Sequence, residues 1–360
     1  MSDELKNYRD KIDAIDDQLL TLVNERAKLA RQIGGLKEDG VIYRPEREAQ
    51  ILRRLQEQNK GPLENDAVSH VFRAVMSNCR ALEKELSVAF LGPLGTYSEE
   101  AALKQFGQGR TAVVCGSIDE VFRTLEANQA DYGVVPVENS TEGAIGLTLD
   151  LLLSSPLKIC GEITLPVHHC LLSKQMDIAK IQHVFSHGQS LSQCHEWLNK
   201  NLPKTQREAV ASNAVAAQII HDLVSAEGTF AAAIASKRAA ELFELNVLAE
   251  NIEDDPKNTT RFLVIGRHEV ASSGNDKTSL VISTKNKPGA MVELLEPLAR
   301  HGVSMTKLES RPSKIELWNY VFFVDIEGHQ ADKKVQAALA DLRERASSVK
   351  VLGSYPVAVI

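Results

Sequence analysis

The chain has 360 residues, of which 43% are hydrophobic and 25% charged, and its formal net charge is −7. This length predicts two or three domains, and the hydrophobic fraction is enough to build their cores. A net negative charge argues against nucleic acid as the main partner, because nucleic-acid binding usually needs a basic surface. The polar start, Met1 to Lys6, lacks the features of a signal peptide, and no apolar run approaches the ~18 residues of a membrane helix.

The cysteines point to the redox environment of the protein. They are odd in number and scattered, and no two of them form a CxxC pair: Cys79, Cys115, Cys160, Cys170 and Cys194. This pattern favours reduced thiols and therefore a cytoplasmic protein. The run His168-His169-Cys170 has no cysteine or carboxylate partners at ligand spacing, so we expect no metal site.

The first region, residues 1–86, has the pattern of an all-α domain. Apolar residues from Leu5 to Ile33 recur at steps of three and four, which predicts a long amphipathic helix. Arg26 stands on its apolar stripe. Lys37 would share that face in a continuous helix, because eleven steps of about 100° make three turns plus about 20°. A cation on such a stripe either pairs with another helix or meets an anionic ligand.

Two further helices are expected in this region. One begins near Pro45, which is tolerated in a first helical turn, and it carries Arg47 and Glu48. In the other, Glu83 continues the apolar face on which Met76 lies. Together with the cations of the first helix, these side chains describe a pocket for a small, multiply negative molecule.

This arrangement resembles an all-helical chorismate mutase, an interlocked dimer whose long first helix lends one arginine to the partner's site. The resemblance implies Arg9 as the cross-subunit arginine, Arg26 and Arg47 at the substrate carboxylates, Lys37 and Glu83 beside the breaking ether oxygen, Glu48 at the substrate hydroxyl, and Arg44 and Cys79 as further contacts. The reaction rearranges a dianion and needs no cofactor or metal. Glu83 stands where some members have glutamine, and a carboxyl group donates a hydrogen bond only when it is protonated.

The middle region, residues 87–267, alternates strands and helices, which predicts an α/β domain. Strands are expected at 112–115, 133–137, 163–172, 182–185, 231–234 and 262–265. The loop from Gly92 to Gly95 lacks both common nucleotide-binding patterns. Hydroxyl and amide side chains stand at two strand ends, in Asn139-Ser140-Thr141 and in Asn258-Thr259-Thr260. They suit an anionic ligand, although an ordinary polar turn would also explain the first of them.

Both segments, together with Gly92–Ser98 and Val184–Cys194, resemble the active-site segments of prephenate dehydratases. That family implies a two-lobed fold like type 2 periplasmic binding proteins, with prephenate in the cleft. Thr260 is the residue most closely tied to catalysis, and its weakly acidic hydroxyl is expected to donate a hydrogen bond to the leaving group. The other implied contacts are Asn139, Ser140, Thr141, Ser186 and Gln189. Arg261 follows Thr260 in a strand and should therefore face the opposite side.

The last region follows a small polar run, Ala271–Asp276, that predicts a domain boundary. Its expected elements are strand 278–284, helix 288–301, strand 303–310, strand 318–326, helix 332–345 and strand 349–353. This βαββαβ order is the α+β ferredoxin-like fold. The runs Gly289-Ala290-Met291-Val292 and Glu309-Ser310-Arg311-Pro312 resemble the two phenylalanine-binding motifs of the ACT regulatory domain. The N–H groups of a helix start suit an amino acid's carboxylate.

These resemblances imply a multidomain chain: chorismate mutase at 1–86, prephenate dehydratase at 87–267 and an ACT domain at 278–356. We expect a bifunctional enzyme of phenylalanine biosynthesis that binds chorismate, prephenate and phenylalanine, with feedback inhibition by phenylalanine. It should need no cofactor, nucleic acid or membrane and should form a homodimer or higher even oligomer in the cytoplasm. Two alternatives remain open, namely a dehydratase that prefers arogenate and an amino-acid sensor whose catalytic folds have become binding modules.

Overall fold

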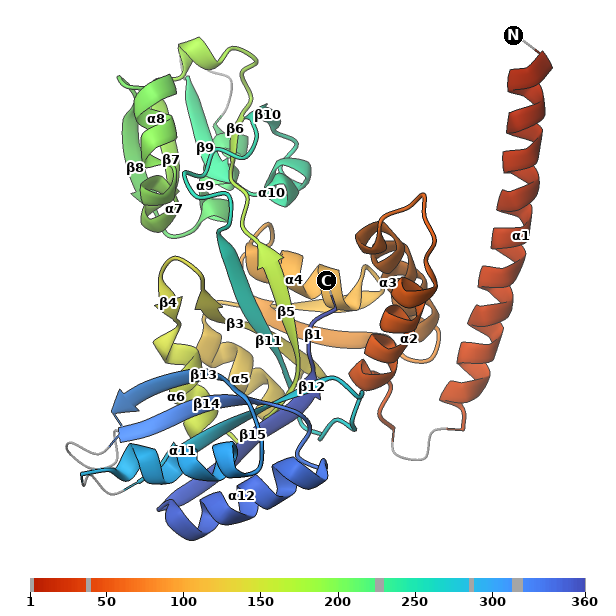
Figure 1. The fold of residues 1–360 in the computed structure, drawn as a ribbon. Coiled ribbons are helices and arrows are strands. Elements are labelled where there is room, and N and C mark those ends of the chain that lie inside the picture. Colours follow the sequence, from red (N-terminus) through yellow and green to blue (C-terminus); the bar gives the residue numbers. More distant parts are fainter. Residues whose placement is uncertain (1–2, 37–39, 224–229, 285–287, 313–319, 360) are drawn as a thin grey trace.

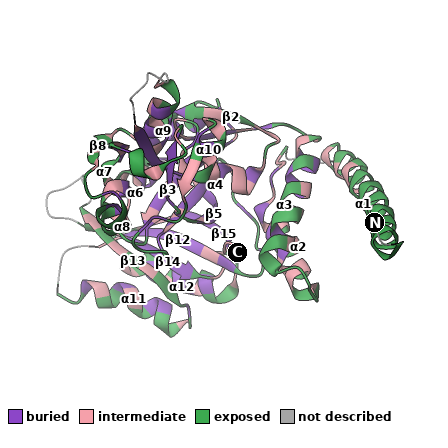
Figure 2. Cartoon of the chain, turned by 90° about the horizontal axis from the view of Figure 1, so that it is seen from above, coloured by how far each residue is buried: buried purple, intermediate pink, exposed green. Residues whose placement is uncertain are grey.

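The structure is a computed structural model that describes residues 3–36, 40–223, 230–284, 288–312 and 320–359. The first region is helical, as expected, with α1 (Asp3–Gly34), α2 (Pro45–Gln58) and α3 (Asn65–Ala81). Most of α1 stands away from the rest of the chain (Figure 1), and none of its residues is buried (Figure 2). Its apolar stripe, including Ile12, Leu19 and Leu22, is therefore exposed within one chain.

The helices of the first region are anchored to the middle region through Tyr43, just before α2. This side chain is fully buried, and its ring lies 4.9 Å from the ring of Phe106 and 5.1 Å from that of Tyr132. Gln105 donates a hydrogen bond to the Tyr43 hydroxyl at 2.5 Å. Burial raises the pKa of Tyr43 well above its usual value, and the negative charge of Glu48 adds to the shift. The phenol therefore stays neutral and serves as a packing anchor.

The middle region has two lobes, as expected. The first lobe contains a mixed sheet in the order β2-β1-β3-β11-β5, with the short β4 paired to β3. Its strands are β1 (Leu86–Leu91), β2 (Arg110–Cys115), β3 (Tyr132–Asn139), β4 (Gly143–Ala144), β5 (Lys158–Pro166) and β11 (Thr259–Gly266). Its helices are α4 (Tyr97–Phe106), α5 (Ile118–Glu126) and α6 (Gly146–Ser154). β11 runs antiparallel to both of its neighbours, β3 and β5.

The second lobe contains a sheet in the order β10-β6-β9-β7-β8. Its strands are β6 (Cys170–Ser173), β7 (His183–His187), β8 (Gln206–Val210), β9 (Ala231–Ala235) and β10 (Asn246–Ala249). Its helices are the 3₁₀ turn η1 (Ile178–Lys180), α7 (Gly188–Gln193), α8 (His195–Asn201), α9 (Asn213–Asp222) and α10 (Lys237–Leu242). The expected single strand 163–172 is wrong, because the chain leaves the first sheet after Pro166 and enters the second at Cys170. It returns to the first lobe before β11.

The last region has the expected βαββαβ order and an antiparallel sheet in the order β13-β14-β12-β15. Its elements are β12 (Asp276–Ser283), α11 (Ala290–Arg300), β13 (Met305–Pro312), β14 (Tyr320–Glu327), α12 (Lys333–Arg345) and β15 (Ser348–Pro356). The two helices cover one face of the sheet (Figure 1). The other face packs on the first lobe, where Val281, Phe323 and Leu352 share a core with Val135 and Leu149.

The contact between this last domain and the first lobe is close at the backbone level. A Cβ atom on Gly353 of β15 would lie 2.2 Å from the carbonyl oxygen of Ile159 in β5, so the strands approach as they do only because residue 353 is glycine. Lys350 Nζ donates hydrogen bonds to the carbonyls of Leu152, Leu153 and Ser155 at 2.9, 2.8 and 2.7 Å. Those carbonyls end α6, where a cation interacts favourably with the helix dipole.

Within the described residues, no helix is both long and apolar enough to cross a membrane. The linker Ala271–Asp276 is tied down by hydrogen bonds. Asp276 accepts from the backbone N–H of Ser273, and Arg53 of α2 donates to Ser273 Oγ at 3.0 Å and to the Asn275 carbonyl at 2.8 Å. The polar composition of this run thus reflects a hydrogen-bonded turn between domains.

Candidate active sites and effector motifs

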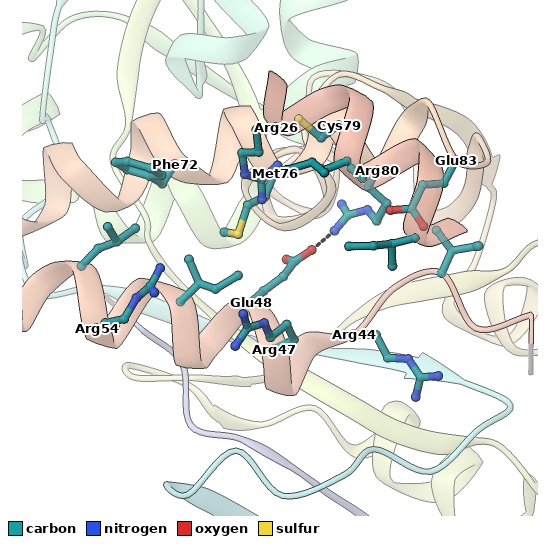
Figure 3. A pocket seen from close by; sticks show the side chains of 16 residues that line it. Arg26, Arg44, Arg47, Glu48, Arg54, Phe72, Met76, Cys79, Arg80 and Glu83 are labelled. Carbon is teal, nitrogen blue, oxygen red and sulfur yellow. Dashed lines mark hydrogen bonds and ion pairs between the residues drawn. The ribbon is translucent and has the colours of Figure 1, made fainter. Parts of the chain in front are cut away.

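A cavity of ≈ 590 Å³ lies between the C-terminal part of α1 and the helices α2 and α3 (Figure 3). Its charged lining residues are five arginines and two glutamates: Arg26, Arg44, Arg47, Glu48, Arg54, Arg80 and Glu83. The rest of the lining is apolar apart from Cys79. An excess of guanidinium groups over carboxylates in an apolar cavity suits a small dianion, because arginine binds carboxylates through two parallel hydrogen bonds.

Six of the eight residues expected at the mutase site line this cavity: Arg26, Arg44, Arg47, Glu48, Cys79 and Glu83. Arg9 does not. It lies seventeen residues before Arg26 on the same helix, a rise of about 25 Å. Lys37 falls outside the described residues. The described helix on which its expected spacing relied, α1, ends at Gly34.

Arg80 is a cavity residue that sequence reasoning missed. Its guanidinium forms an ion pair and hydrogen bond with Glu48 (Figure 3), and it donates to the Phe106 carbonyl at 3.3 Å. The same group lies 5.0 Å from the ring centre of Tyr43 and 5.6 Å from that of Phe106. The dehydratase domain thus holds the arginine that orients Glu48. The available signal was its spacing, since Arg80 stands four residues after Met76 on the pocket-facing side of α3.

Gly34 brings the end of α1 against Glu83. A Cβ atom at residue 34 would lie 3.0 Å from Glu83 Cγ and 3.1 Å from its carboxylate oxygen Oε2. A larger residue there would press directly on the carboxyl group. Glu83 is therefore enclosed between the first and third helices, at the edge of the cation-rich cavity.

In the first lobe, Asn139 at the end of β3 organises the expected dehydratase residues. Its Nδ2 donates to Thr260 Oγ1 and to Asn258 Oδ1, each at 2.9 Å. Its Oδ1 accepts from the backbone N–H of Thr141 at 3.0 Å and from the Thr141 hydroxyl at 2.6 Å. Ser140 Oγ accepts from the backbone N–H of Thr259 at 2.9 Å. Asn139, Ser140, Thr141 and Thr260 thus form one cluster, which we call the Asn139 cluster.

A second set of contacts joins this cluster to the second lobe through Gln193 at the end of α7, which sequence reasoning missed. Gln193 Oε1 accepts from Asn258 Nδ2 at 3.1 Å, and its Nε2 donates to Thr141 Oγ1 at 3.3 Å. The same Oε1 lies 3.0 Å from His169 Nε2. Burial lowers the pKa of His169, so the ring is neutral and donates through Nε2 to this acceptor.

Ser186 and Gln189 lie in the second lobe. Ser186 is fully buried, with its Oγ 2.9 Å from both Asn213 Oδ1 and the Ile234 carbonyl. It therefore braces the end of β7. Gln189 is half-buried in the first turn of α7. Among the described residues, neither side chain is hydrogen-bonded to the Asn139 cluster.

Arg261 faces away from Thr260, as the strand alternation predicts. Its Nε donates to Glu162 at 2.8 Å, its Nη1 to Asp325 at 2.7 Å and its Nη2 to the Tyr355 hydroxyl at 2.9 Å. Burial by itself would lower the pKa of Arg261, but Tyr355, Asp325 and Glu162 together raise it. Since Asp325 and Tyr355 belong to the last domain, this guanidinium joins that domain to β11, the strand that carries Thr260.

The two effector motifs lie at the start of α11 and at the end of β13. Gly289 has φ 79°, in the left-handed region, and caps the helix that begins at Ala290. Val292 is 70% exposed there. Glu309 and Ser310 lie on β13, an edge strand of the sheet. Arg311 instead forms two hydrogen bonds with Asp150 of α6, at 3.1 and 3.2 Å, so in this structure it points to the first lobe.

Family models match the chain in three consecutive parts: "Chorismate mutase type II" at residues 8–84, "Prephenate dehydratase" at 88–270 and "ACT domain" at 278–344. A bifunctional chorismate mutase/prephenate dehydratase of Neisseria gonorrhoeae is 53% identical over 98% of this chain and 97% of its own length. The Escherichia coli K12 protein of the same description is 35% identical over 97% and 95%.

A solved structure agrees with the fold of the last two parts. The prephenate dehydratase from Arthrobacter aurescens, in complex with L-Phe, is 32% identical and superposes with a TM-score of 0.70 over 76% of this chain and 93% of its own. The near-complete coverage of full-length relatives includes all three domains in the same order. This chain belongs to the family of bifunctional chorismate mutase/prephenate dehydratases.

Proposed function

We propose that the chain rearranges chorismate to prephenate in the cavity of α1, α2 and α3 and converts prephenate to phenylpyruvate beside the Asn139 cluster. Phenylalanine binds the ACT domain and inhibits the second reaction. The observation that carries this proposal is the convergence of Arg26, Arg47, Glu48 and Glu83 in one cation-rich cavity. These residues come from three helices, and their types match a rearrangement that needs only charge and shape.

The mutase reaction breaks a C–O bond and forms a C–C bond within one dianion. Arg26 and Arg47 bind the carboxylates and select the compact shape that reacts. Arg80 fixes the Glu48 carboxylate, which accepts the hydrogen bond of the substrate hydroxyl. Protonated Glu83 and Lys37 donate to the ether oxygen as negative charge develops on it. By analogy with oxyanion-hole donors, each such donor contributes about 2.7–4 kcal/mol to catalysis.

The dehydratase reaction expels the ring hydroxyl while carbon dioxide leaves and the ring becomes aromatic. Asn139 Nδ2 donates to Thr260 Oγ1, so the threonine oxygen already accepts a hydrogen bond and its own proton remains available to donate. This orientation supports Thr260 as the donor to the departing hydroxyl. Ser140 presents a further hydroxyl beside it for a substrate carboxylate, and Gln189 would approach from the second lobe. The Thr141 hydroxyl already donates to Asn139 Oδ1 and the Ser186 hydroxyl is buried, so these two residues hold the shape of the site.

The exposed apolar stripe of α1 supports a homodimer. Ile12, Leu19 and Leu22 are each more than half exposed on a helix with no buried residue. Such a stripe on a helix of 32 residues is a surface that a second copy would cover. Arg9, remote from the cavity of its own chain, would then enter the cavity of the partner. All five cysteines are buried and unpaired, which supports a reducing, cytoplasmic location.

The ACT domain is proposed as the phenylalanine site, with Gly289, Ala290, Met291 and Val292 at the helix start and Glu309, Ser310, Arg311 and Pro312 on β13. Cutting the chain near Gly274 is a poor test of this site. Removal of the domain would take Asp325 and Tyr355 away from Arg261 and would expose the apolar side chains of the first lobe that pack on the ACT sheet. Point substitutions in the full chain are the better test.

The first prediction concerns the overall reaction. Purified protein supplied with chorismate and no cofactor should form phenylpyruvate, followed by its absorbance in alkali. An amino-acid sensor with inactive domains would form none.

Parallel assays with prephenate and arogenate, which differ by one amine, decide the preferred substrate. We expect a higher kcat/KM with prephenate, and the reverse order would assign the arogenate reaction.

The second prediction concerns Thr260. Thr260→Ala removes the donor to the leaving hydroxyl and should lower dehydratase kcat by about 10²–10³, as for other donors to a developing negative charge. Thr260→Ser keeps the hydroxyl and should retain more activity. Mutase activity of the same samples is the control and should stay near that of the wild type. An equal loss of both activities would indicate misfolding and would leave the role of Thr260 unsupported.

The third prediction concerns Glu83. A group at this position serves the reaction only if it can donate a hydrogen bond to the ether oxygen. Glu83→Gln keeps a donor of nearly the same shape and should retain mutase activity, whereas Glu83→Ala removes the donor and should lower mutase kcat by about 10²–10³. An equal loss of mutase kcat in the two variants would exclude Glu83 from the role of a donor to the ether oxygen.

The fourth prediction concerns the proposed exchange of Arg9 between subunits. Arg9→Ala and Arg26→Ala should each abolish most mutase activity. When the two inactive proteins are unfolded together and refolded, half of the dimers contain one of each chain, and such a dimer has one intact cavity. Mutase activity should therefore return to roughly a quarter of the wild-type level, as for intersubunit sites in general. An absence of recovery, with dimers present by sedimentation, would place Arg9 in its own chain's site or in neither.

A further inference from the structure

Two neighbouring residue pairs across β3 and β11 face opposite sides of the first sheet. Thr260 pairs with Asn139, and Arg261 pairs with Glu138. Since successive side chains alternate, the first pair lies in the proposed catalytic cluster and the second faces the ACT domain. The register shifts directly after Arg261, at a β-bulge, which is a common device for aiming side chains near active sites. Adjacent residues of β11 thus carry the hydroxyl proposed for catalysis, on Thr260, and the contact with the ACT domain, made by Arg261.

Strand β13, which carries the second effector motif, forms ion pairs with the first lobe at two points. Lys307 Nζ on β13 lies 2.7 Å from Glu138 Oε2, and the lysine side chain is only 14% exposed. Further along β13, Arg311 binds Asp150 of α6. The two acceptors flank residues 139–149, so the segment that contains the proposed catalytic turn is attached on both sides to the same strand of the ACT domain.

We propose that Glu138 is a positioning residue for the dehydratase reaction, and that its ion pair with Lys307 transmits the position of β13 to the Asn139 cluster. This inference rests on the proposed function and names the route of its regulation. When phenylalanine shifts β13, the buried ammonium group must either draw Glu138 with it or lose its partner. Either change displaces the adjacent Asn139, whose amide orients the Thr260 hydroxyl.

The charges around this pair determine which of its contacts can change. Arg261 Nη1 also lies 3.8 Å from Glu138, so the carboxylate sits between a cation fixed by the ACT sheet and a cation on β13. The Glu138 side chain is 37% exposed, but the Lys307 side chain is only 14% exposed, and a buried charge is costly without a partner. A shift of β13 therefore forces the pair to rearrange. Arg261 remains held by Glu162, Asp325 and Tyr355 whatever Lys307 does. Lys307 is thus the contact that can change without dismantling the domain interface.

The decisive variant is Lys307→Met, which removes the charge and keeps the length of the side chain. We expect it to bind phenylalanine with a Kd within about three-fold of the wild type by calorimetry. At saturating phenylalanine it should retain at least five-fold more dehydratase activity than the inhibited wild type, since allosteric couplings are typically about 5–150-fold. Lys307→Arg should restore inhibition. Lys334→Met, the same change at an exposed position of α12, is the matched control and should behave as the wild type.

A double-mutant cycle checks that the lysine acts through Glu138. If one ion pair carries the coupling, Lys307→Met by itself already removes it. Adding Glu138→Gln to Lys307→Met should therefore cause no further loss of inhibition by phenylalanine. Mutase activity reports whether each variant is folded. Inhibition of Lys307→Met to the wild-type level would overturn the proposal. A parallel loss of binding and inhibition would also overturn it, because Lys307 would then belong to the effector site.

A readout that does not need catalysis separates this proposal from the proposed function. The amides of Thr141 and Glu142 donate to Asn139 Oδ1 at 3.0 and 3.2 Å, so their hydrogen exchange reports the geometry of the cluster. Phenylalanine should change this exchange in the wild type and leave it unchanged in Lys307→Met. If the wild type forms phenylpyruvate but phenylalanine leaves the exchange unchanged, the coupling proposal is wrong and the proposed function stands. If phenylalanine changes the exchange but no phenylpyruvate forms, the proposed function is wrong and the coupling stands.

Discussion

The buried guanidinium of Arg261 is the interaction on which the arrangement of the last two domains depends. A charge with its side chain 16% exposed needs partners for its donors, and no single domain supplies them all. Glu162 comes from β5 of the first lobe, whereas Asp325 and Tyr355 come from β14 and β15 of the ACT sheet. Loss of one partner of a buried ion pair typically costs about 3–5 kcal/mol, so undocking the ACT domain carries a large penalty. Strand β11, which carries Thr260, is consequently part of the domain junction.

Much of the architecture and of the mutase site was predictable from the sequence, and the exceptions have physical causes. Helical spacing places Arg26 and Arg47 on the inner faces of α1 and α2 and Glu83 just after α3, and the packing of these helices brings the three side chains into one cavity. Lys37 could not be placed in this way, because Gly34 ends the helix on which the argument relied. Arg80 was missed because its partners, Glu48 and the Phe106 carbonyl, are remote in sequence, and no local pattern reports such a contact.

The α/β elements show the same division between local and long-range information. The run 163–172 reads as one strand because both of its halves are buried and apolar, and nothing in that pattern reveals that the chain changes sheets after Pro166. β8 was not predicted because Gln206–Val210 is a polar edge strand. The opposite orientation of Arg261 and Thr260 was predicted correctly, since strand alternation is a local rule. The attachment of Arg311 to Asp150 depends on how two domains dock, which short motifs do not encode.

The contacts between α2, α3 and residues 357–359 bear on the order in which this chain folds. Arg53 donates to the Val357 carbonyl across 304 residues, and Arg73 donates to the Val359 carbonyl across 286. Closing a loop of this length costs entropy that only many simultaneous contacts recover. The mutase helices depend on short-range contacts and can therefore form early. Their contacts with residues 357–359 form only after the ACT sheet has closed. The hydrogen bonds of Arg53 and Arg73 would then be among the last contacts of these helices to form, after the strands of both lobes.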